Sequence, residues 1–331
     1  MRYPPRLLLA AALVAVFLCP TPAAGDTEPT RADQWRTIAQ RALDRYTAIQ
    51  GSTTQQAMAL SYAAQSSAWL SADGWQDPVA QAYLQRLYML RNPDGGWGLG
   101  AAYDAHQDGS INASSTTYVV TLAGHVGPTL LDAWRAGIVP RADVQTVVDL
   151  IVTAPRIDTT TGRCVAYSRA AADAKTGLCV HNVSAGAGAF LFQAGQAGFA
   201  PAWWLIAGIA KRTASAYNLT TRMTPYKDAT APTSDDPDHA SYTAESMLWL
   251  DPAIGYVAAY YLAVNDFDHP QTPIAHMRLT GAPDVPGGTP WCELGDRWLT
   301  EADAYITTSA NDPVRLSQIA YYGARNARVC A

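Results

Sequence analysis

The residues best suited to acid–base chemistry are concentrated between Asp235 and Glu245. Two neighbouring carboxylates, Asp235 and Asp236, are followed by His239, Tyr242 and Glu245. Carboxyl, imidazole and phenol groups at one junction can supply a proton donor, a proton acceptor and a group that orients a substrate. If a helix begins just after His239, then His239, Tyr242 and Glu245 lie near one another at three-residue steps. The sequence predicts these five residues as catalytic, with His239 and Tyr242 as the proton-transfer pair.

A helix cap is the alternative interpretation of the same acids. Acidic side chains before a helix and in its first turn interact favourably with the helix dipole. This explains Asp235, Asp236 and Asp238 without any catalytic role. It does not require His239 or Tyr242, so both interpretations stay open.

A second polar cluster offers hard oxygen atoms within a short loop. Asp104, Asp108 and Asn112 are ligand types that suit calcium. Their spacing does not match the calcium loop of an EF-hand, and a solvated turn is the alternative. Calcium is therefore the candidate cofactor, and no other is expected.

Further histidines occur in less informative surroundings. His181 and Asn182 follow Cys179 at an expected helix start, where Asn182 or Ser184 also suits an N-cap. His125 stands alone on an apolar helix, where a hydrogen-bonded core histidine is favoured over a catalytic one. No Gly-x-Ser-x-Gly elbow, phosphate loop, dinucleotide fingerprint or His-Glu-x-x-His motif occurs in the sequence.

The aromatic composition is skewed toward residues with a polar edge. Ten Trp and 17 Tyr stand against five Phe. Trp and Tyr combine a flat apolar face with a hydrogen-bonding group, which suits sugar rings and amphipathic ligands as well as ordinary helix packing. Those in expected loops are the ligand-contact candidates, namely Trp75, Tyr226 and Trp291.

Helices must position these groups, because segments with helical periodicity follow one another with almost no strand-like alternation. The predicted helices are Trp35–Ile49, Gln55–Leu70, Val79–Arg91, Thr116–Ala136, Asp143–Val152, Ser184–Gly198, Ala202–Tyr217, Ser241–Leu250, Pro252–Val264, Asp296–Ile306 and Pro313–Ala327. Many form antiparallel-looking pairs with short joins, and paired hairpins can close into a ring. The predicted fold is all-α, an α/α toroid or barrel of helical hairpins. A helical bundle or an open helical array is the alternative.

Four long stretches are predicted to be non-helical and to gather at one end of the ring. Loops of this length inside a domain are often functional. They are Asp94–Ser115, Pro155–Asn182, Thr220–Ala240 and Asn265–Asp296.

One local motif supports the toroid. In Arg91-Asn92-Pro93-Asp94-Gly95-Gly96-Trp97-Gly98, the proline stops the preceding helix and the glycines allow backbone angles closed to other residues. Trp97 is predicted to be a buried wedge between helices. The segment resembles the QxxDGGWG turn of triterpene cyclases and other terpenoid-cyclase-like α/α toroids, with Arg91 where that family has Gln. The resemblance implies the fold and no catalytic residue, because the Asp-x-Asp-Asp motif of the cyclases does not occur in this sequence.

The N-terminus reads as an export signal. Two arginines precede the apolar run Leu7–Leu18, and small residues lead to Gly25. The run is shorter than the ~20 residues of a membrane span, and no later segment is long and apolar enough. We therefore expect residues 1–25 to be a secretory signal peptide and residues 26–331 to be a single all-α domain, secreted without a transmembrane anchor.

Without the signal the chain has 21 Lys and Arg against 28 Asp and Glu, a net charge of −7. An acidic chain without a basic patch is a poor nucleic-acid binder, so a nucleic-acid partner is not expected.

Four cysteines remain, and an even number in an exported chain indicates disulfides. Local pairing of Cys164 with Cys179 and of Cys292 with Cys330 is preferred among the three possible connectivities. A zinc site that includes Cys179 and His181 is the rival, although their spacing is too short for the usual paired ligands.

Three functions are consistent with these features. The first is an exported enzyme that acts on an extracellular glycan or similar polymer. Two carboxylates about 5–10 Å apart would support hydrolysis, and a His/Tyr pair near an Asn would support elimination by a lyase. The second is a terpenoid-cyclase-like enzyme, or a relative that binds a small apolar ligand in the toroid cavity. The third is a secreted binding protein without catalysis.

Overall fold

Helices make up most of the chain. The computed structural model describes residues 29–49, 55–104, 109–228, 237–265, 272–280, 282, 292, 295–309 and 311–330. The helices are α1 (Arg31–Ile49), α2 (Gln56–Leu70), the 3₁₀ turn η1 (Gly74–Gln76), α3 (Pro78–Met89), α4 (Val119–Thr121), the π-helical segment η2 (Leu122–Val126), α5 (Gly127–Arg135), α6 (Arg141–Val152), α7 (Ala171–Lys175), α8 (His181–Gln196), α9 (Trp203–Ala216), α10 (Pro237–Leu250), α11 (Pro252–Val264), α12 (Thr272–Thr280), α13 (Gly295–Thr308) and α14 (Pro313–Val329).

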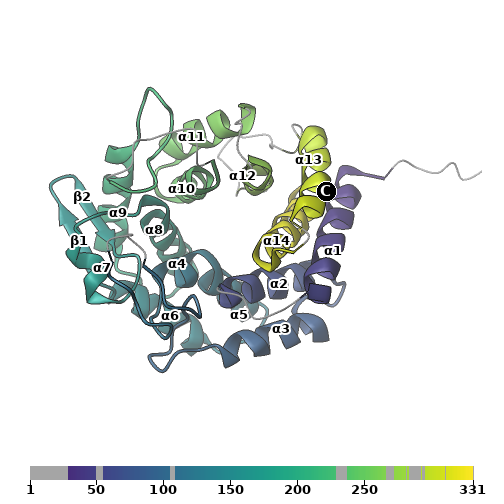
Figure 1. The fold of residues 1–331 in the computed structure, drawn as a ribbon, viewed down its shortest axis with the longest axis horizontal. Coiled ribbons are helices and arrows are strands. Elements are labelled where there is room, and N and C mark those ends of the chain that lie inside the picture. The colour runs from purple at the N-terminus through teal and green to yellow at the C-terminus, as the bar shows by residue number, and fades with distance from the viewer. Residues whose placement is uncertain are drawn as a thin grey trace, which may run out of the picture.

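These helices close into a double ring (Figure 1). In the inner ring each member packs against the next, in the order α2, η2, α8, α10, α12, α14 and back to α2. Helices α1, α3, α6, α9, α11 and α13 lie outside them. Because α1 packs against α14, the first and last described helices are neighbours. The architecture is an α/α toroid, as the sequence predicts.

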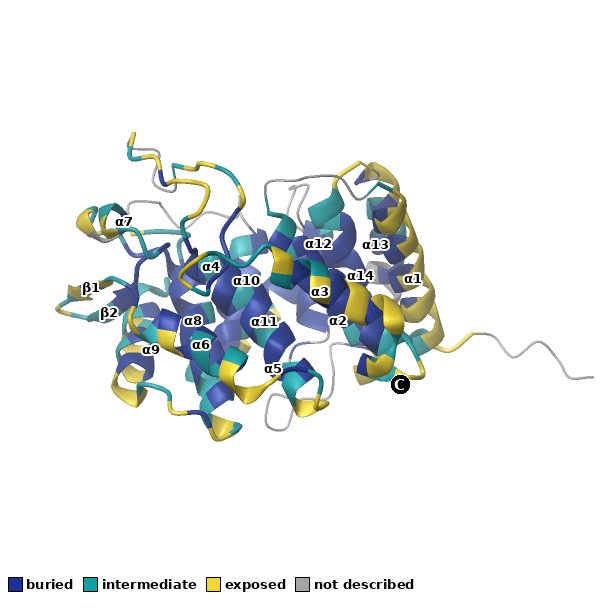
Figure 2. Cartoon of the chain, turned by 90° about the horizontal axis from the view of Figure 1, so that it is seen from below, coloured by how far each residue is buried: buried dark blue, intermediate teal, exposed yellow. Residues whose placement is uncertain are grey.

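Composition decides which helices are inner and which are outer. In α2 every residue from Ala59 to Ala68 is buried, and small side chains predominate. The outer helix α1 buries only one stripe, which includes Trp35, Ile38 and Leu43. Figure 2 shows exposed residues along the outer surfaces of α1 and α3. A helix that is apolar on all sides must be enclosed, whereas an amphipathic helix can cover it.

Aspartate directly precedes the first-turn proline of α3, α10, α11 and α14, and the aspartate is among the described residues at α3, α11 and α14. Proline suits the first helical position, where its missing N–H needs no partner. Asp77 before α3 and Asp312 before α14 each accept hydrogen bonds from two first-turn N–H groups, at 2.7–3.0 Å. Asp251 accepts one such bond before α11, at 3.4 Å. These caps fix where α3, α11 and α14 begin.

The Asp-Gly-Gly-Trp turn after α3 has the predicted structure. Gly95 has φ of +86°, a conformation that favours glycine. Trp97 is fully buried, and its indole N–H donates to the Leu87 carbonyl at 2.8 Å. The Arg91 guanidinium carbon lies 5.2 Å from the centre of the Trp97 ring. Trp97 is thus the buried wedge expected from the sequence.

The structure corrects three details of the sequence prediction. The stretch Pro155–Asn182 contains an antiparallel hairpin, β1 (Arg156–Thr159) with β2 (Gly162–Val165), in which Arg156 pairs with Val165, and it also contains α7. The stretch Asn265–Asp296 contains α12, whose residues other than Pro273 are all buried, so no amphipathic pattern marks it. The predicted helix Thr116–Ala136 begins at Val119 and passes through the π segment before α5.

Both predicted disulfides are present. Cys164 in β2 is joined to Cys179 before α8, with a Cα–Cα distance of 5.8 Å. Cys292 is joined to Cys330 at the end of α14, with a Cα–Cα distance of 5.6 Å. The local pairing is confirmed.

Some sequence predictions fall on residues outside the described ranges. These are the signal segment 1–25, Asp108, Asp235, Asp236 and Trp291. Within the described ranges, no helix has the length and apolar character needed to span a membrane.

Candidate functional site

A cavity of about 420 Å³, here called the central cavity, lies where the inner helices begin. Its lining comes from α2, the α4–η2 segment, α8, α10 and α14, all through their amino-terminal parts, and from two loop tyrosines. The lining residues are Gln55, Met58, Tyr62, Val120, Gly124, His125, Tyr167, Asn182, Val183, Gly186, Tyr226, Asp238, His239, Tyr242, Asp312, Val314, Arg315 and Gln318. Because helix amino termini carry partial positive charge, this end of the toroid favours negatively charged groups.

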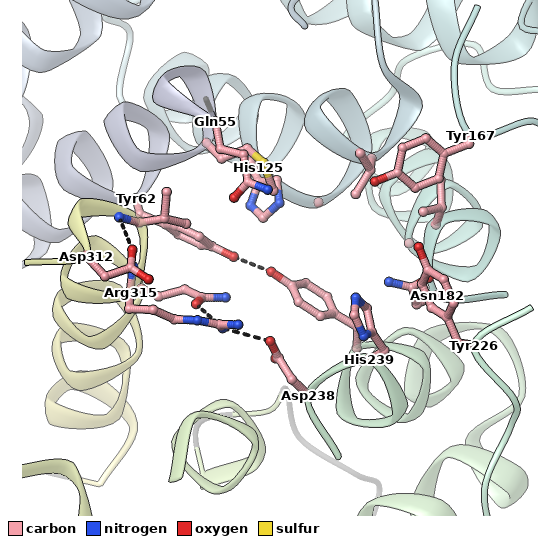
Figure 3. Close-up of a pocket in the computed structure, with 18 residues that line it drawn as sticks. Gln55, Tyr62, His125, Tyr167, Asn182, Tyr226, Asp238, His239, Asp312 and Arg315 are labelled. Atoms are coloured by element: carbon pink, nitrogen blue, oxygen red, sulfur yellow. Dashed lines mark hydrogen bonds and ion pairs between the residues drawn. The ribbon is translucent and has the colours of Figure 1, made fainter. Parts of the chain in front are cut away.

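A buried carboxylate that lies between two arginines forms one side of the cavity, and Figure 3 shows it with one of them, Arg315. Asp238, in the first turn of α10, lies with its Oδ1 2.7 Å from Arg278 Nη1 and its Oδ2 2.8 Å from Arg315 Nη1. Burial alone would raise the pKa of Asp238, but the Arg278 and Arg315 guanidiniums outweigh burial and hold this pKa well below its usual value. Asp238 is therefore ionised and cannot be a proton donor near neutral pH.

Three phenols and the Arg278 guanidinium lie next to this ion pair. The Tyr62 and Tyr242 hydroxyls are hydrogen-bonded to each other, and Arg278 Nε donates to the Tyr322 hydroxyl at 2.7 Å. The Arg278 guanidinium carbon lies 3.3 Å from the centre of the Tyr242 ring. Burial raises the pKa of Tyr62 well above its usual value, with Tyr242 and Tyr322 contributing, so Tyr62 is a neutral phenol.

Two buried uncharged side chains of the lining have an atom without a hydrogen-bond partner among the described residues, namely His125 Nδ1 and Asn182 Oδ1. A third such atom, Asp238 Oδ1, is ion-paired with Arg278. Burial lowers the pKa of His125 to about 3, and Arg278 adds to the shift, so the imidazole is uncharged. Buried polar groups are nearly always hydrogen-bonded, and His125 and Asn182 both line the cavity. A bound ligand with hydroxyl or amide groups could satisfy them.

The backbone at His125 and at Gln55 is unusual. His125 lies in the π-helical segment η2, a geometry often found at functional sites. Gln55, at the start of α2, has φ of 104°, and its N–H donates to the Leu99 carbonyl at 2.9 Å. A non-glycine residue in this region is strained, and such strain is concentrated at functional sites.

The opposite wall is aromatic. The Tyr226 ring lies 4.5 Å from the His239 imidazole, centre to centre, and Tyr167 lines the same cavity. Burial raises the pKa of Tyr167 well above its usual value, so it remains a neutral phenol. Figure 3 shows Tyr226, His239 and Asn182 together on this side. These side chains present ring faces and hydrogen-bonding groups to whatever occupies the cavity.

The structure brings together only some of the residues predicted from sequence. His239, Tyr242 and Tyr226 all line the central cavity. Glu245, one turn further along α10, instead pairs with Arg325, with Oε1 2.5 Å from Nη1, and does not line that cavity. Trp75 is buried in η1, where its indole N–H donates to Asp132 at 2.9 Å, and it does not line the central cavity.

The calcium candidates have internal partners. Asp104 Oδ2 accepts a hydrogen bond from the Gly109 N–H at 2.7 Å. Asn112 is buried and donates from Nδ2 to both oxygens of Asp173, at 3.0 and 3.1 Å. Among the residues described, no group of three or more His, Cys, Asp or Glu side chains is arranged to hold a metal ion.

His181 holds loops together rather than lining the cavity. Its Nε2 lies 2.9 Å from Asp228 Oδ1, and Arg212 pairs with the same carboxylate. Asp228 also accepts a hydrogen bond from the Cys179 N–H at 3.1 Å, next to the disulfide. Burial lowers the pKa of His181, although Asp228 opposes the shift.

The cavity also brings together residues that the sequence did not point to. Asp238 was explained as a cap, and nothing in the sequence connects it with Arg278 or Arg315, which lie 40 and 77 residues further along the chain. His125 was assigned to the core. It is buried, but it also faces the cavity. Only the order of helices around the ring brings these groups together.

The whole fold is similar to two solved glucanase structures. The endo-1,4-D-glucanase from Vibrio fischeri ES114 aligns with a TM-score of 0.53 and 12% identity, over 85% of this chain and 93% of that chain. The apo structure of the β-1,3-1,4-glucanase from Paenibacillus sp. X4 aligns with a TM-score of 0.56 and 11% identity, over 90% and 92%. At such identities the likeness shows a shared α/α toroid fold. The terpenoid-cyclase superfamily that the Asp-Gly-Gly-Trp turn resembles is not shown by these comparisons.

No protein-family model matches the sequence, and no curated protein matches it significantly.

Proposed function

We propose that the protein hydrolyses glycosidic bonds of an extracellular glycan that binds in the central cavity. The observation that carries this proposal is the character of the cavity, in which uncharged aromatic and amide groups surround an ionised carboxylate at the centre of the toroid. The two similar structures are named glucanases, which supports the same class of reaction for this chain.

Sugar rings suit the walls of this cavity. Tyr167, Tyr226 and His239 offer flat faces against which the apolar side of a pyranose can pack. His125 Nδ1 and Asn182 Oδ1 can bond to ring hydroxyls, because both are buried without a partner. The cavity volume of about 420 Å³ is within the range of small-molecule sites, so one or two sugar units fit inside.

Hydrolysis requires one carboxyl group that donates a proton and a second carboxylate that activates water or attacks the sugar. Asp238 is held ionised, so it does not donate. Asp312 is the exposed carboxylate of the cavity lining; its Oδ1 caps α14, and we assign the activation of water to its Oδ2. Asp235 and Asp236 immediately precede α10 in the chain, and we assign the proton donor to one of them. His239 and Tyr242 then contact the sugar and hold it between the acids.

The test is activity on a panel of glucans, including soluble cellulose derivatives and mixed-linkage β-glucan, with release of reducing ends as the readout. Asp235→Asn, Asp236→Asn and Asp312→Asn are compared with Asp303→Asn, whose carboxylate pairs with Arg41 on the outside of the ring. Loss of a general acid or base should lower kcat by at least about a hundredfold. If Asp235→Asn, Asp236→Asn and Asp312→Asn all retain wild-type kcat and are folded by circular dichroism, the assignment is wrong.

One observation favours elimination as a second candidate. The Tyr62–Tyr242 hydroxyl pair lies beside His125, with ring centres of Tyr62 and His125 4.8 Å apart, and Asn182 lines the same cavity. A phenol, an imidazole and an amide at one site are the groups a lyase uses on a uronic-acid polymer. Elimination produces a conjugated double bond. Ultraviolet absorbance that rises during cleavage of a polyuronate would therefore identify this reaction, and hydrolysis would not produce it.

The other interpretations of the sequence predict different results. A toroid that binds a small apolar ligand should take up a hydrophobic fluorescent dye in competition with terpenoid alcohols, and a binding protein should retain glycans without cleaving them. We also propose that residues 1–25 are removed on export and that residues 26–331 act as one domain. The mass of the protein recovered from culture medium tests the cleavage.

A further inference from the structure

A second cavity lies at the other ends of the same inner helices. This opposite cavity has a volume of about 350 Å³. Its lining includes Gln65 and Trp69 from α2, Asp132 from α5, Gln193 from α8, Trp249 from α10 and Arg325 from α14. These residues come from the carboxy-terminal parts of helices whose amino-terminal parts form the central cavity.

The walls of the opposite cavity are aromatic, and the aromatic surface continues outward from it. Trp69, Phe190, Trp249 and Tyr321 line the cavity. Outside it, Phe192 lies 6.2 Å from Trp249 and 6.0 Å from Trp203, centre to centre, and Trp203 is 53% exposed. Rings therefore lead from the outer surface into the cavity.

The polar groups of this cavity select a neutral ligand. Glu245 is paired with Arg325, and the Asp132 carboxylate accepts hydrogen bonds from the Trp69 and Trp75 indoles at 2.9 Å. Arg135 also lines the cavity, so its two acidic and two basic side chains balance in charge, and a charged ligand would bring an unmatched charge. A purely apolar ligand would remove the charged side chains and the Gln193 amide from water without forming hydrogen bonds to them. Burial of polar groups without hydrogen bonds is unfavourable. A ligand with both ring faces and hydroxyls satisfies both kinds of lining.

Two glycines separate the opposite cavity from the central one. Gly124, Gly186 and Tyr242 line both cavities. A Cβ added at Gly186 would meet nothing within 4 Å. At Gly188, two residues further along the same helix, an added Cβ would lie 3.0 Å from Ile209. Glycine inside a helix lowers its stability, and close packing explains Gly188 but not Gly186. The open space beside Gly186 lies between the two cavities.

We propose that the opposite cavity is a second saccharide-binding site, which holds sugar units of the glycan through Trp249 and Gln193 on the far side of the toroid from the reaction. For the ligand class this rests on the proposed function. The site itself rests on the aromatic lining, the paired charges and the space kept open beside Gly186.

The position of tryptophans allows a direct test. None of the described residues that line the central cavity is a tryptophan, whereas Trp69 and Trp249 line the opposite cavity. We would label the full chain with 5-fluorotryptophan, assign resonances by single Trp→Phe variants, and titrate with cellohexaose and with mixed-linkage β-glucan oligosaccharides. The proposal expects saturable shifts of the Trp69 and Trp249 fluorine resonances. The Trp204 resonance, from a 48% exposed side chain outside both linings, should not move.

Variants identify the groups that bind. Gln193→Ala and Trp249→Ala should each weaken binding, followed at the Trp69 resonance, by about tenfold or more, as expected for a central contact in a buried site. Trp204→Ala is the matched control and should leave the dissociation constant unchanged. Gln193 is partly exposed, so its variant retains the fold even if Trp249→Ala does not.

The outcomes separate this proposal from the proposed function. Glucan cleavage with no shift at Trp69 or Trp249 would overturn the second site and leave the central site intact. Saturable shifts without cleavage of any glycan would support the second site and overturn hydrolysis. If Gln193→Ala and Trp249→Ala bind the oligosaccharides with the wild-type dissociation constant, the bound sugar lies elsewhere. This result would also overturn the proposal.

Discussion

Replacing Asp238 by Asn should destabilise the toroid strongly, because it removes the negative charge that two arginines share. Asp238 is 5% exposed, and Arg278 is fully buried. Removal of one partner of a buried ion pair typically costs about 3–5 kcal/mol. Arg278 would keep its bonds to Ser241 at 2.5 Å and to Tyr322 at 2.7 Å, and Arg315 would keep its bond to Gln318 at 2.8 Å. We therefore expect the lower end, a loss of about 3 kcal/mol in the free energy of unfolding at neutral pH.

The same pair gives this loss a definite pH dependence. The folded-state pKa of Asp238 is lowered, so its charge stabilises the fold above the unfolded-state pKa of about 3.9. This contribution is lost as the pH falls below that value toward the folded-state pKa. The difference in stability between wild type and Asp238→Asn should therefore be constant from about pH 5 upward and should shrink below about pH 4.

Urea unfolding followed by circular dichroism, at neutral pH and at about pH 3, measures both effects. Asp303→Asn is the control, because its pair with Arg41 has half-exposed side chains on both sides and should contribute at most about 1 kcal/mol. A loss below about 1 kcal/mol for Asp238→Asn at neutral pH would refute the reasoning. So would a loss of equal size at both pH values, because it would show that the ionised carboxylate is not what stabilises the fold.

Three further predictions concern the framework. Trp97→Ala should lower the free energy of unfolding by about 3–5 kcal/mol, as other large core truncations do, and a melting temperature that stays the same would contradict its role as a wedge. Replacing both Cys164 and Cys179 by Ala should lower the free energy of unfolding by about 3 kcal/mol, as expected for a disulfide that closes a loop of this length. In the wild-type protein, peptide mapping under non-reducing conditions should recover the two cysteines as one linked pair rather than as free thiols. Gly186→Ala should stabilise the protein by about 0.5–1 kcal/mol, because its Cβ enters open space. Gly188→Ala should gain less or lose stability, and equal effects in chemical denaturation would show that packing does not distinguish the two glycines.

The fold could be predicted because its signals are local. Helical periodicity and Asp-Pro starts mark most helices, and the Asp-Gly-Gly-Trp turn fixes one corner of the ring. Helix α12 was missed for the opposite reason. Buried polar residues such as His276 and Arg278 take the place of the apolar stripe that a periodicity search recognises. The π segment around His125 was also not predictable, since it depends on how η2 packs between its neighbours in the inner ring.

The candidate site could be predicted only where it is contiguous in sequence. The junction before α10 was recognised by its polar residues, and His239 and Tyr242 do line the central cavity. Glu245 was grouped with them by helical spacing, but α10 runs through the toroid, so one further turn takes this side chain to Arg325 and the opposite cavity. Periodicity gives the face of a helix that a residue occupies and says nothing about its depth in the ring.

The position of a residue along its inner helix decides which of the two cavities it can line. The inner helices begin at the central cavity and end at the opposite one, so a residue near a helix start meets partners from other helix starts, however distant in sequence. Asp238 and Arg315 are an example, because they lie in the first turns of α10 and α14 and form an ion pair, which Arg278 joins from the last turn of α12. The lining of the central cavity therefore directs mutagenesis to the amino-terminal parts of α2, α8, α10 and α14.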